Sequence, residues 1–170
     1  MAGKRHFTRK TFKFMADLAD NNDREWFAEN KHRYEADVKD ASLGFIEDFA
    51  AELQKLSPHF MATNRSLFRI YRDVRFSKDK SPYKTHAGIH FRHEQSKNAY
   101  APGYYLHLEP GSVFAGMGIW HPEGKALRAI RDHIVAEPAA WKKASRGKKF
   151  RDTVQFEGDR LSRPPKGFDP

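Results

Sequence analysis

The residues Tyr104–Trp120, with the sequence YYLHLEPGSVFAGMGIW, constrain the fold more than any other segment, because two alternating runs are joined by a tight turn. Pro110 and Gly111 take the two central positions of the connection. Glycine tolerates the positive φ that the second central position of a type II turn requires. The segment therefore predicts an antiparallel hairpin with strands at 104–109 and 113–120.

Counting back from this turn predicts the register of the hairpin, because successive side chains of a strand point to opposite faces. The predicted core-facing pairs are Leu108 with Val113, Leu106 with Ala115, and Tyr104 with Met117. The other face is predicted to pair His107 with Phe114, Tyr105 with Gly116, and Gly103 with Gly118. Glycines inside a strand often mark close approach of a ligand or another backbone. Two interpretations stay open: a binding groove walled by Tyr105, His107 and Trp120, or a surface on which another helix packs.

Helical periodicity flanks the hairpin on both sides, and strand-like segments lie directly before it. Predicted helices cover 12–19, 24–56 with a break at Ser42 and Gly44, a segment after Pro122 with Leu127, Ile130 and Ile134 inward, and 138–145; further strands are predicted at 67–76, 85–93 and near 150–156. This order predicts an α+β fold with N-terminal helices, a central antiparallel sheet and further helices after 122. A length of 170 residues suits one domain, 1–170.

Composition excludes several classes of protein. The sequence has no cysteine, which rules out disulfides, thiolate metal sites and a cysteine nucleophile. No apolar run approaches the roughly 20 residues of a membrane helix, and the basic N-terminus lacks the apolar region of a secretory signal. We therefore expect a cytoplasmic protein. There is no Walker-type loop and no dinucleotide fingerprint, so no cofactor is expected.

The net charge of +9 is unevenly distributed. Residues 65–92 contain eight lysines and arginines against two aspartates, and residues 142–166 contain nine against three acidic side chains. Basic patches of this kind attract phosphates, nucleic acid or acidic partners. The alternative interpretation is a solvated basic surface.

The basic segment FRIYRDVRFSKDKSPYKTHAGIHF, residues 68–91, combines a strand-like start with many cations. Alternation places Arg72 among apolar side chains, where it needs a carboxylate partner, a bound anion or a bulge that turns it outward. The arginines offer flat bidentate donors, and the lysines that follow offer point charges. Together they predict an anion cradle, with solvated lysines beside structural ion pairs as the alternative.

Histidines and carboxylates in and near this segment are the acid–base candidates if the protein is an enzyme: Asp73, His86, His107 and Glu109. Alternation puts His86 and His90 on one face and His93 on the other. This spacing is no strong metal signature. We therefore predict no metal site, with a site that also uses His107 or Glu109 as the alternative.

Four segments, NNDREWFAENKHRY, YRDVRFSKDKSPYKTH, PGYYLHLEPGSVFAGMGIWHP and RPPKGF, resemble the domain-of-unknown-function family 2461. The resemblance covers nearly the whole chain and implies no established activity. It places the family's signature residues in two groups: Arg72, Asp73, Arg75, Phe76, Lys80, Pro82, Tyr83 and Lys84, and then Gly103, Tyr105, Gly118 and Trp120. It also implies a further helical portion after RPPKGF, so we expect the chain to be truncated there.

The leading hypothesis is a protein that binds a phosphate- or carboxylate-bearing small molecule, with nucleic acid as another anionic partner. The predicted ligand-binding residues are Arg72, Arg75, Lys80, Tyr83, Lys84, Tyr105 and Trp120. One alternative is an enzyme acting on a phosphate-bearing substrate. Another is a structural or partner-binding protein in which the basic residues make internal ion pairs.

Overall fold

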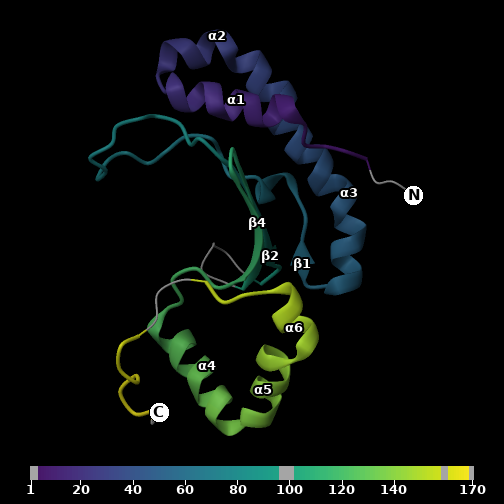
Figure 1. Cartoon of the computed structure of the whole chain (residues 1–170), viewed down its shortest axis with the longest axis vertical. Coiled ribbons are helices and arrows are strands. Elements are labelled where there is room, and N and C mark those ends of the chain that lie inside the picture. The colour runs from purple at the N-terminus through teal and green to yellow at the C-terminus, as the bar shows by residue number, and fades with distance from the viewer. Residues whose placement is uncertain (1–3, 96–101, 158–160, 169–170) are drawn as a thin grey trace. The chain divides into compact units, whose positions relative to one another are not determined.

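The computed structural model describes residues 4–95, 102–157 and 161–168. The chain forms two compact units, Met1–Pro122 and Glu123–Pro170 (Figure 1). The first unit contains α1 (Arg9–Asp20), α2 (Arg24–Tyr34), the π-helix η1 (Glu35–Lys39), α3 (Asp40–Leu56), β1 (Phe60–Met61), the 3-10 helix η2 (Asn64–Ser66), β2 (Ala87–His93), β3 (Gly103–Glu109) and β4 (Ser112–Gly118). The second contains α4 (Gly124–Ala136), α5 (Pro138–Arg146) and α6 (Lys148–Thr153). Helices with an antiparallel sheet make this an α+β fold, as predicted.

The first helices begin at side chains that satisfy their free backbone N–H groups. The Thr8 hydroxyl accepts a hydrogen bond from the Lys10 N–H, and the Thr8 N–H donates to the Thr11 hydroxyl, which completes a capping box. The Asp23 carboxylate accepts from the Trp26 N–H at 2.9 Å. The predicted stop and restart at residues 20–23 is therefore confirmed.

The predicted break at Ser42 and Gly44 is wrong, because helical structure continues from α2 through η1 into α3. The irregularity lies instead in the π-helical turn of η1. The Ser42 hydroxyl is accommodated inside the helix by donating to the Val38 carbonyl at 2.6 Å. Gly44 has a packing role, since a Cβ at this position would lie 3.2 Å from Nδ1 of His6.

The sheet has the strand order β1-β2-β3-β4, and all neighbours are antiparallel. The predicted hairpin register is confirmed at every pair: Leu108–Val113, Leu106–Ala115, Tyr104–Met117, His107–Phe114, Tyr105–Gly116 and Gly103–Gly118. Gly111 has φ +78°, as the turn chemistry requires. Strand β2 lies within the predicted 85–93, whereas the short β1 was not predicted.

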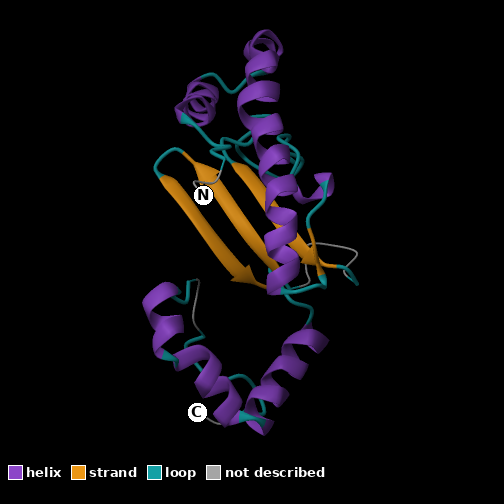
Figure 2. Cartoon of the chain, turned by 90° about the vertical axis from the view of Figure 1, so that its right-hand side faces the viewer, coloured by secondary structure: helices purple, strands orange, loops and turns teal. Residues whose placement is uncertain are grey.

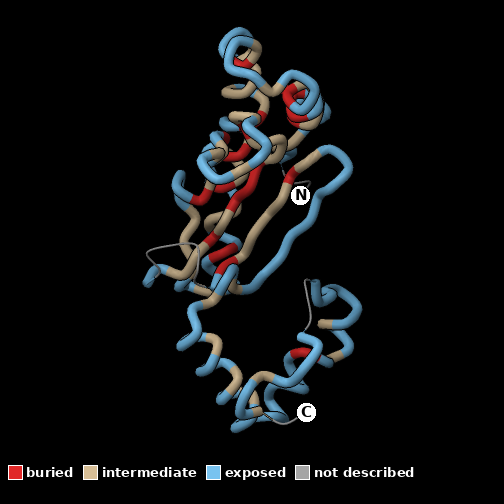
Figure 3. The backbone as a smooth tube through the Cα atoms, turned by 90° about the vertical axis from the view of Figure 1, so that its left-hand side faces the viewer, coloured by how far each residue is buried: buried red, intermediate tan, exposed pale blue. Residues whose placement is uncertain are grey.

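Helix α3 crosses one face of the sheet (Figure 2). A core cluster between them contains the buried residues Ile46, Leu53, Ile89 and Phe91. A second core cluster joins α1, α2 and η1 to the sheet end that carries Ala87 and Leu108. Burial falls across the sheet from β2 to the edge strand β4 (Figure 3). Val113 and Met117 were predicted to face the core, but they are 58% and 57% exposed because they lie on this edge strand.

The predicted strand at 67–76 is wrong, because only two isolated bridges form there, Leu67–Ile89 and Tyr71–Tyr83. The Phe68 N–H donates to the Gly88 carbonyl, while the Lys84 N–H donates to the Ile70 carbonyl. The register thus shifts between these two contacts, which interrupts the ladder. Residues 72–82, named here the basic loop, then leave the sheet on the side opposite α3 (Figure 1).

The second unit confirms the helix predicted after Pro122 and the short helix near 138–145. In α4, Leu127 and Ile134 are half-buried, but Ile130 is exposed. The strand predicted near 150–156 is wrong, since α6 occupies its first part. Phe156 packs near Trp141 and Phe150, so its contacts are aromatic. Across the described residues, neither unit contains a helix with the length and apolarity that crossing a bilayer demands.

Candidate functional site

The arginines of the basic loop are held by carboxylates of the same loop. Arg72 donates to the Asp79 carboxylate and, at 3.1 Å, to the Ser81 carbonyl. Arg75 donates to Asp73 through Nε at 2.9 Å and through Nη2 at 2.6 Å. For Arg72, the carboxylate partner is therefore the alternative that the structure adopts.

Hydrogen bonding to these partners lowers both aspartate pKa values. The Asp73 pKa falls to about 2, chiefly because Arg75 donates to the carboxylate. The Asp79 pKa also falls to about 2, first through the Ser81 hydroxyl and N–H and then through Arg72. The loop is thus a self-contained network, built from two turns in which an aspartate accepts from the residue two positions later.

Lys80 of the basic loop and Lys84, two residues beyond it, differ in their surroundings. Lys80 Nζ donates to the Val74 carbonyl at 2.9 Å and is exposed. Lys84 is half-buried, and its Nζ donates to the Arg69 carbonyl at 2.6 Å. Its ammonium also lies 5.8 Å from the centre of the Phe68 ring. Burial lowers the Lys84 pKa, with a further contribution from the nearby Arg69 charge.

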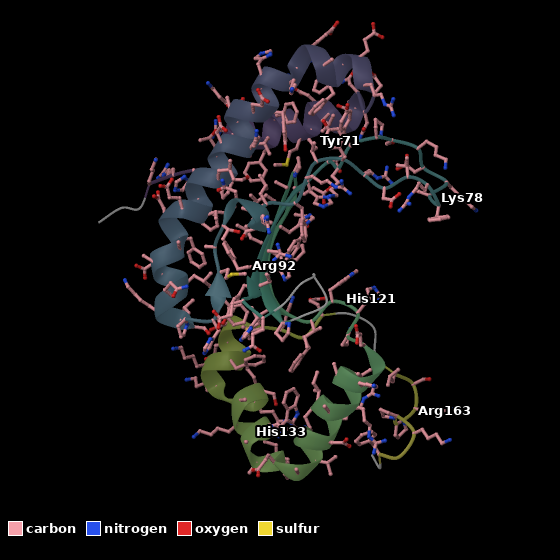
Figure 4. The ribbon with its side chains drawn as sticks, turned by 180° about the vertical axis from the view of Figure 1, so that it is seen from behind. Tyr71, Lys78, Arg92, His121, His133 and Arg163 are labelled. Atoms are coloured by element: carbon pink, nitrogen blue, oxygen red, sulfur yellow. The ribbon has the colours of Figure 1, made fainter. Side chains whose placement is uncertain are left out.

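Tyr83, predicted to contact a ligand, lies in the core at 6% exposure. Its ring stacks on Phe27 with a centroid distance of 4.1 Å. Asn22 fixes the backbone of Tyr83 twice: its amide group donates to the Tyr83 carbonyl at 3.0 Å, and its oxygen accepts from the Tyr83 N–H at 3.1 Å. The base of the basic loop is therefore attached to the turn between α1 and α2. Figure 4 shows Tyr71 near this base and Lys78 at the outer end.

A groove of about 740 Å³ lies on the face of the sheet opposite α3. Its lining is mainly aromatic side chains and glycines: Phe68, His90, Gly103, Tyr105, His107, Phe114, Gly116, Met117, Gly118, Ile119 and Trp120. Tyr105 and Trp120, two predicted ligand-binding residues, lie here, and so does His107. Phe68, His90 and Phe114 were not predicted as site residues. The pairing of His90 with Tyr105 and of Phe114 with His107 places two of them on the groove face and could have indicated their role.

The glycines of the groove have two different roles. A Cβ at Gly116 or Gly118 would meet no atom within 4 Å among the described residues, so these two positions form an open floor. Gly103 is covered instead, because a Cβ there would overlap the His90 ring and lie 2.9 Å from the Phe91 carbonyl oxygen. The glycine surface is thus open along β4, whereas on β3 His90 of the neighbouring strand β2 covers Gly103.

A chain of hydrogen bonds runs along the groove face of β3. The Tyr105 hydroxyl lies 3.0 Å from His107 Nδ1, and His107 Nε2 lies 3.1 Å from Glu109 Oε2. The other Glu109 oxygen accepts from the Thr85 hydroxyl at 3.1 Å. These contacts lower the Glu109 pKa, with the His107 hydrogen bond as the largest cause. Both nitrogens of His107 therefore have partners.

His86 lies beside this chain, just before the start of β2. Its ring centre lies 4.5 Å from that of His107, and burial together with the proximity of His107 lowers its pKa. The structure therefore brings together three of the four acid–base candidates, His86, His107 and Glu109. The fourth, Asp73, lies in the basic loop and is paired with Arg75.

Comparison with known proteins identifies a family. Neither the curated proteins nor the solved structures contain a match to this chain. The family described as conserved hypothetical protein (DUF2461) matches residues 10–170, which is nearly the whole chain. The chain therefore belongs to the DUF2461 family.

Proposed function

We propose that this protein binds a small anionic molecule in the groove, with an aromatic or other flat apolar part of the ligand against the groove walls. The phosphate or carboxylate of the ligand would lie at the end of the groove nearest Lys84. The open glycine floor beside Tyr105 and Trp120 is the observation that carries this proposal.

The form of the groove supports a small ligand. Sites for small molecules usually have volumes of about 300–1,000 Å³ and are lined mainly by apolar and aromatic side chains with a few polar groups. The groove has this size and composition. Trp120 is 72% exposed and Phe114 is 50% exposed, so both rings are accessible to a flat ligand.

Lys84 supplies a charge beside the groove. Its ammonium lies beside Phe68, which lines the groove, and its charge also acts on His86. Arg92 adds a second charge, because it pairs with Gly103 across the sheet and shares its face. Figure 4 labels Arg92 on the sheet. Half-buried cations bind anions more strongly than fully solvated ones, since water screens them less.

The other cations of the basic segment have a structural role in this proposal. Arg72 and Arg75 donate to Asp79 and Asp73, and Lys80 donates to a backbone carbonyl. A ligand anion would have to displace the two aspartates. Lys80 is exposed, whereas Lys84, which also donates to a backbone carbonyl, is half-buried beside Phe68. The proposal therefore assigns Arg72, Arg75 and Lys80 to the shape of the loop, and Lys84 to the ligand.

The test is isothermal titration calorimetry with phenyl phosphate. Phenol and inorganic phosphate, which each carry one part of this molecule, are titrated for comparison. We expect phenyl phosphate to bind more tightly than either of these, because it engages both the aromatic walls and Lys84. Gly116→Leu should abolish binding by filling the floor, whereas Lys80→Met should leave it unchanged. Equal affinity for phenyl phosphate and inorganic phosphate, or full binding by Gly116→Leu, would contradict the proposal.

A second candidate function, an enzyme acting on a phosphate-bearing ligand, is favoured by the His107–Glu109 pair. A histidine oriented by a carboxylate is a common general base. Both nitrogens of His107 are engaged, so it must release one partner before it can accept a proton from a ligand. Incubating the purified protein with aryl phosphates and nucleotides tests this: turnover lost in His107→Gln supports it, and absence of turnover favours binding alone.

A further inference from the structure

The cluster of His86, His107 and Glu109, named here the histidine–glutamate cluster, lies where β3 turns into β4. The pairing of Ala87 with Leu108 places His86 beside Glu109 across the two strands. His107 precedes Glu109 by two residues and so shares its face. The sheet itself therefore directs the three side chains to one place, without any contribution from the basic loop.

We infer that the histidine–glutamate cluster binds a divalent transition-metal ion, of which zinc and iron(II) fit the ligands best. Each residue offers one donor atom, and these atoms all lie within 4.8 Å of one another. Bonds of about 2.0–2.1 Å in a tetrahedral zinc site place ligand atoms about 3.3 Å apart. His107 Nε2 and Glu109 Oε2 are already 3.1 Å apart, so a metal ion can replace their hydrogen bond with small movements.

The ligand chemistry selects the class of metal. Two imidazoles with one carboxylate form the ligand set of hydrolytic zinc sites and of non-haem iron(II) sites. Calcium and magnesium favour sites made of oxygen atoms. Within the described residues, this is the one group of three or more such side chains whose donor atoms come this close together.

Outer partners already orient two of the three ligands, as metal sites require. With Nε2 of His107 on the metal, Nδ1 would donate its proton to the Tyr105 hydroxyl, which lies 3.0 Å away. The Glu109 oxygen that faces away from His107 accepts from Thr85 at 3.1 Å. Both ligands would thus keep these outer partners when the ion binds.

Three protein ligands leave at least one coordination position open. His107 also lines the groove, so a ligand bound there would lie next to the cluster. In the part of this inference that rests on the proposed function, the metal and Lys84 would together hold the ligand's phosphate or carboxylate. The metal site itself depends only on the cluster.

The test is calorimetric titration of the full chain, freed of metal with a chelator, with zinc chloride, and absorption spectroscopy with cobalt(II) as the spectroscopic probe. We expect one ion per chain and the visible bands of a four- or five-coordinate cobalt site. Magnesium and calcium should not bind. Absence of zinc and cobalt binding by the wild-type chain would overturn the inference.

Variants locate the site. His86→Ala and Glu109→Gln should each weaken zinc binding at least about 100-fold, while Thr85→Val should cost about tenfold through loss of an outer partner. His59→Ala is the matched control, because His59 also lies beside a glutamate, Glu94 at 2.8 Å, but outside the cluster. Unchanged binding in both Glu109→Gln and His86→Ala, or binding lost in His59→Ala, would overturn the inference. Glu109→Gln keeps the shape of the side chain, which guards against a folding defect.

Addition of phenyl phosphate to the cobalt-loaded protein separates the metal site from the proposed function. A change in the visible bands means that the ligand's phosphate occupies the open position. Bands that stay unchanged while phenyl phosphate binds would overturn the shared-site part alone. If cobalt binds but phenyl phosphate does not, the result would instead contradict the proposed function.

Discussion

The basic loop and the groove differ in how their polar groups are satisfied. In the loop, the arginines carry the charge, yet aspartates of the same loop neutralise them. In the groove, few residues are charged, but an open floor and aromatic walls offer surface for a ligand. A high density of cations in a sequence is therefore weak evidence for an anion-binding site, because nearby carboxylates can form ion pairs with them. Glycines within a strand leave open surface, and the proposed ligand site rests on this feature.

The largest effect is expected at the base of the loop. Asn22→Ala should lower the free energy of unfolding by about 2–3 kcal/mol, because it removes two hydrogen bonds and leaves the Tyr83 N–H and carbonyl without that partner. Urea denaturation followed by circular dichroism measures this. Asn21→Ala is the control, since Asn21 makes one exposed hydrogen bond to the Asp17 carbonyl. Equal effects of the two substitutions would contradict the view that the loop is anchored at its base.

The glycines of the groove give the next contrast. Gly103→Ala should destabilise the protein by about 2 kcal/mol, because the added Cβ meets the His90 ring and the Phe91 carbonyl. Gly118→Ala should stay within about 0.5 kcal/mol of the wild type, since a Cβ there meets no described atom. Thermal unfolding of both variants checks this pair. A large loss in Gly118→Ala would mean that something in the folded protein covers the floor.

Substitutions of Lys84 and Lys78 should affect the binding of phenyl phosphate differently, because Lys84 lies beside the groove and Lys78 lies in the basic loop. Lys84→Met should weaken phenyl phosphate binding about tenfold, as expected for loss of a charge-assisted hydrogen bond. Lys78→Met, at the outer end of the loop (Figure 4), should change the affinity by no more than about twofold at physiological salt. Calorimetry of the two variants in parallel measures the difference. If Lys78→Met had the larger effect, the ligand would lie on the loop.

The smallest effect concerns pH. The folded-state pKa values of Asp73 and Asp79 are lowered to about 2 from 3.8, so their pairs contribute stability above pH 3.8 and lose it as the pH falls through about 2. Both carboxylates are exposed, so the contribution to stability should be small. Carboxyl NMR titration should find a depressed Asp73 pKa that rises toward 3.8 in Arg75→Ala. An Asp73 pKa unaffected by this substitution would show that the pair does not persist in solution.

Sequence reasoning worked best where local chemistry determines the structure. The Pro110–Gly111 turn fixes the hairpin register, so all of its pairs could be predicted. The structure of segment 67–76 could not be predicted in this way, because its apolar alternation indicated a strand. Its backbone hydrogen bonds with 82–88 instead shift register, and Arg72 pairs with Asp79 within a loop. His86 was separated from His107 in sequence, and only the pairing of β2 with β3 brings them together.

The most direct test of the central claim, that the ligand site is the groove and not the basic loop, is an NMR titration of the isotope-labelled chain with phenyl phosphate. Amide shifts should concentrate at 103–107 and 114–120, with a smaller response at Lys84. Shifts confined to residues 72–82 would contradict the claim and return the site to the arginines of the loop.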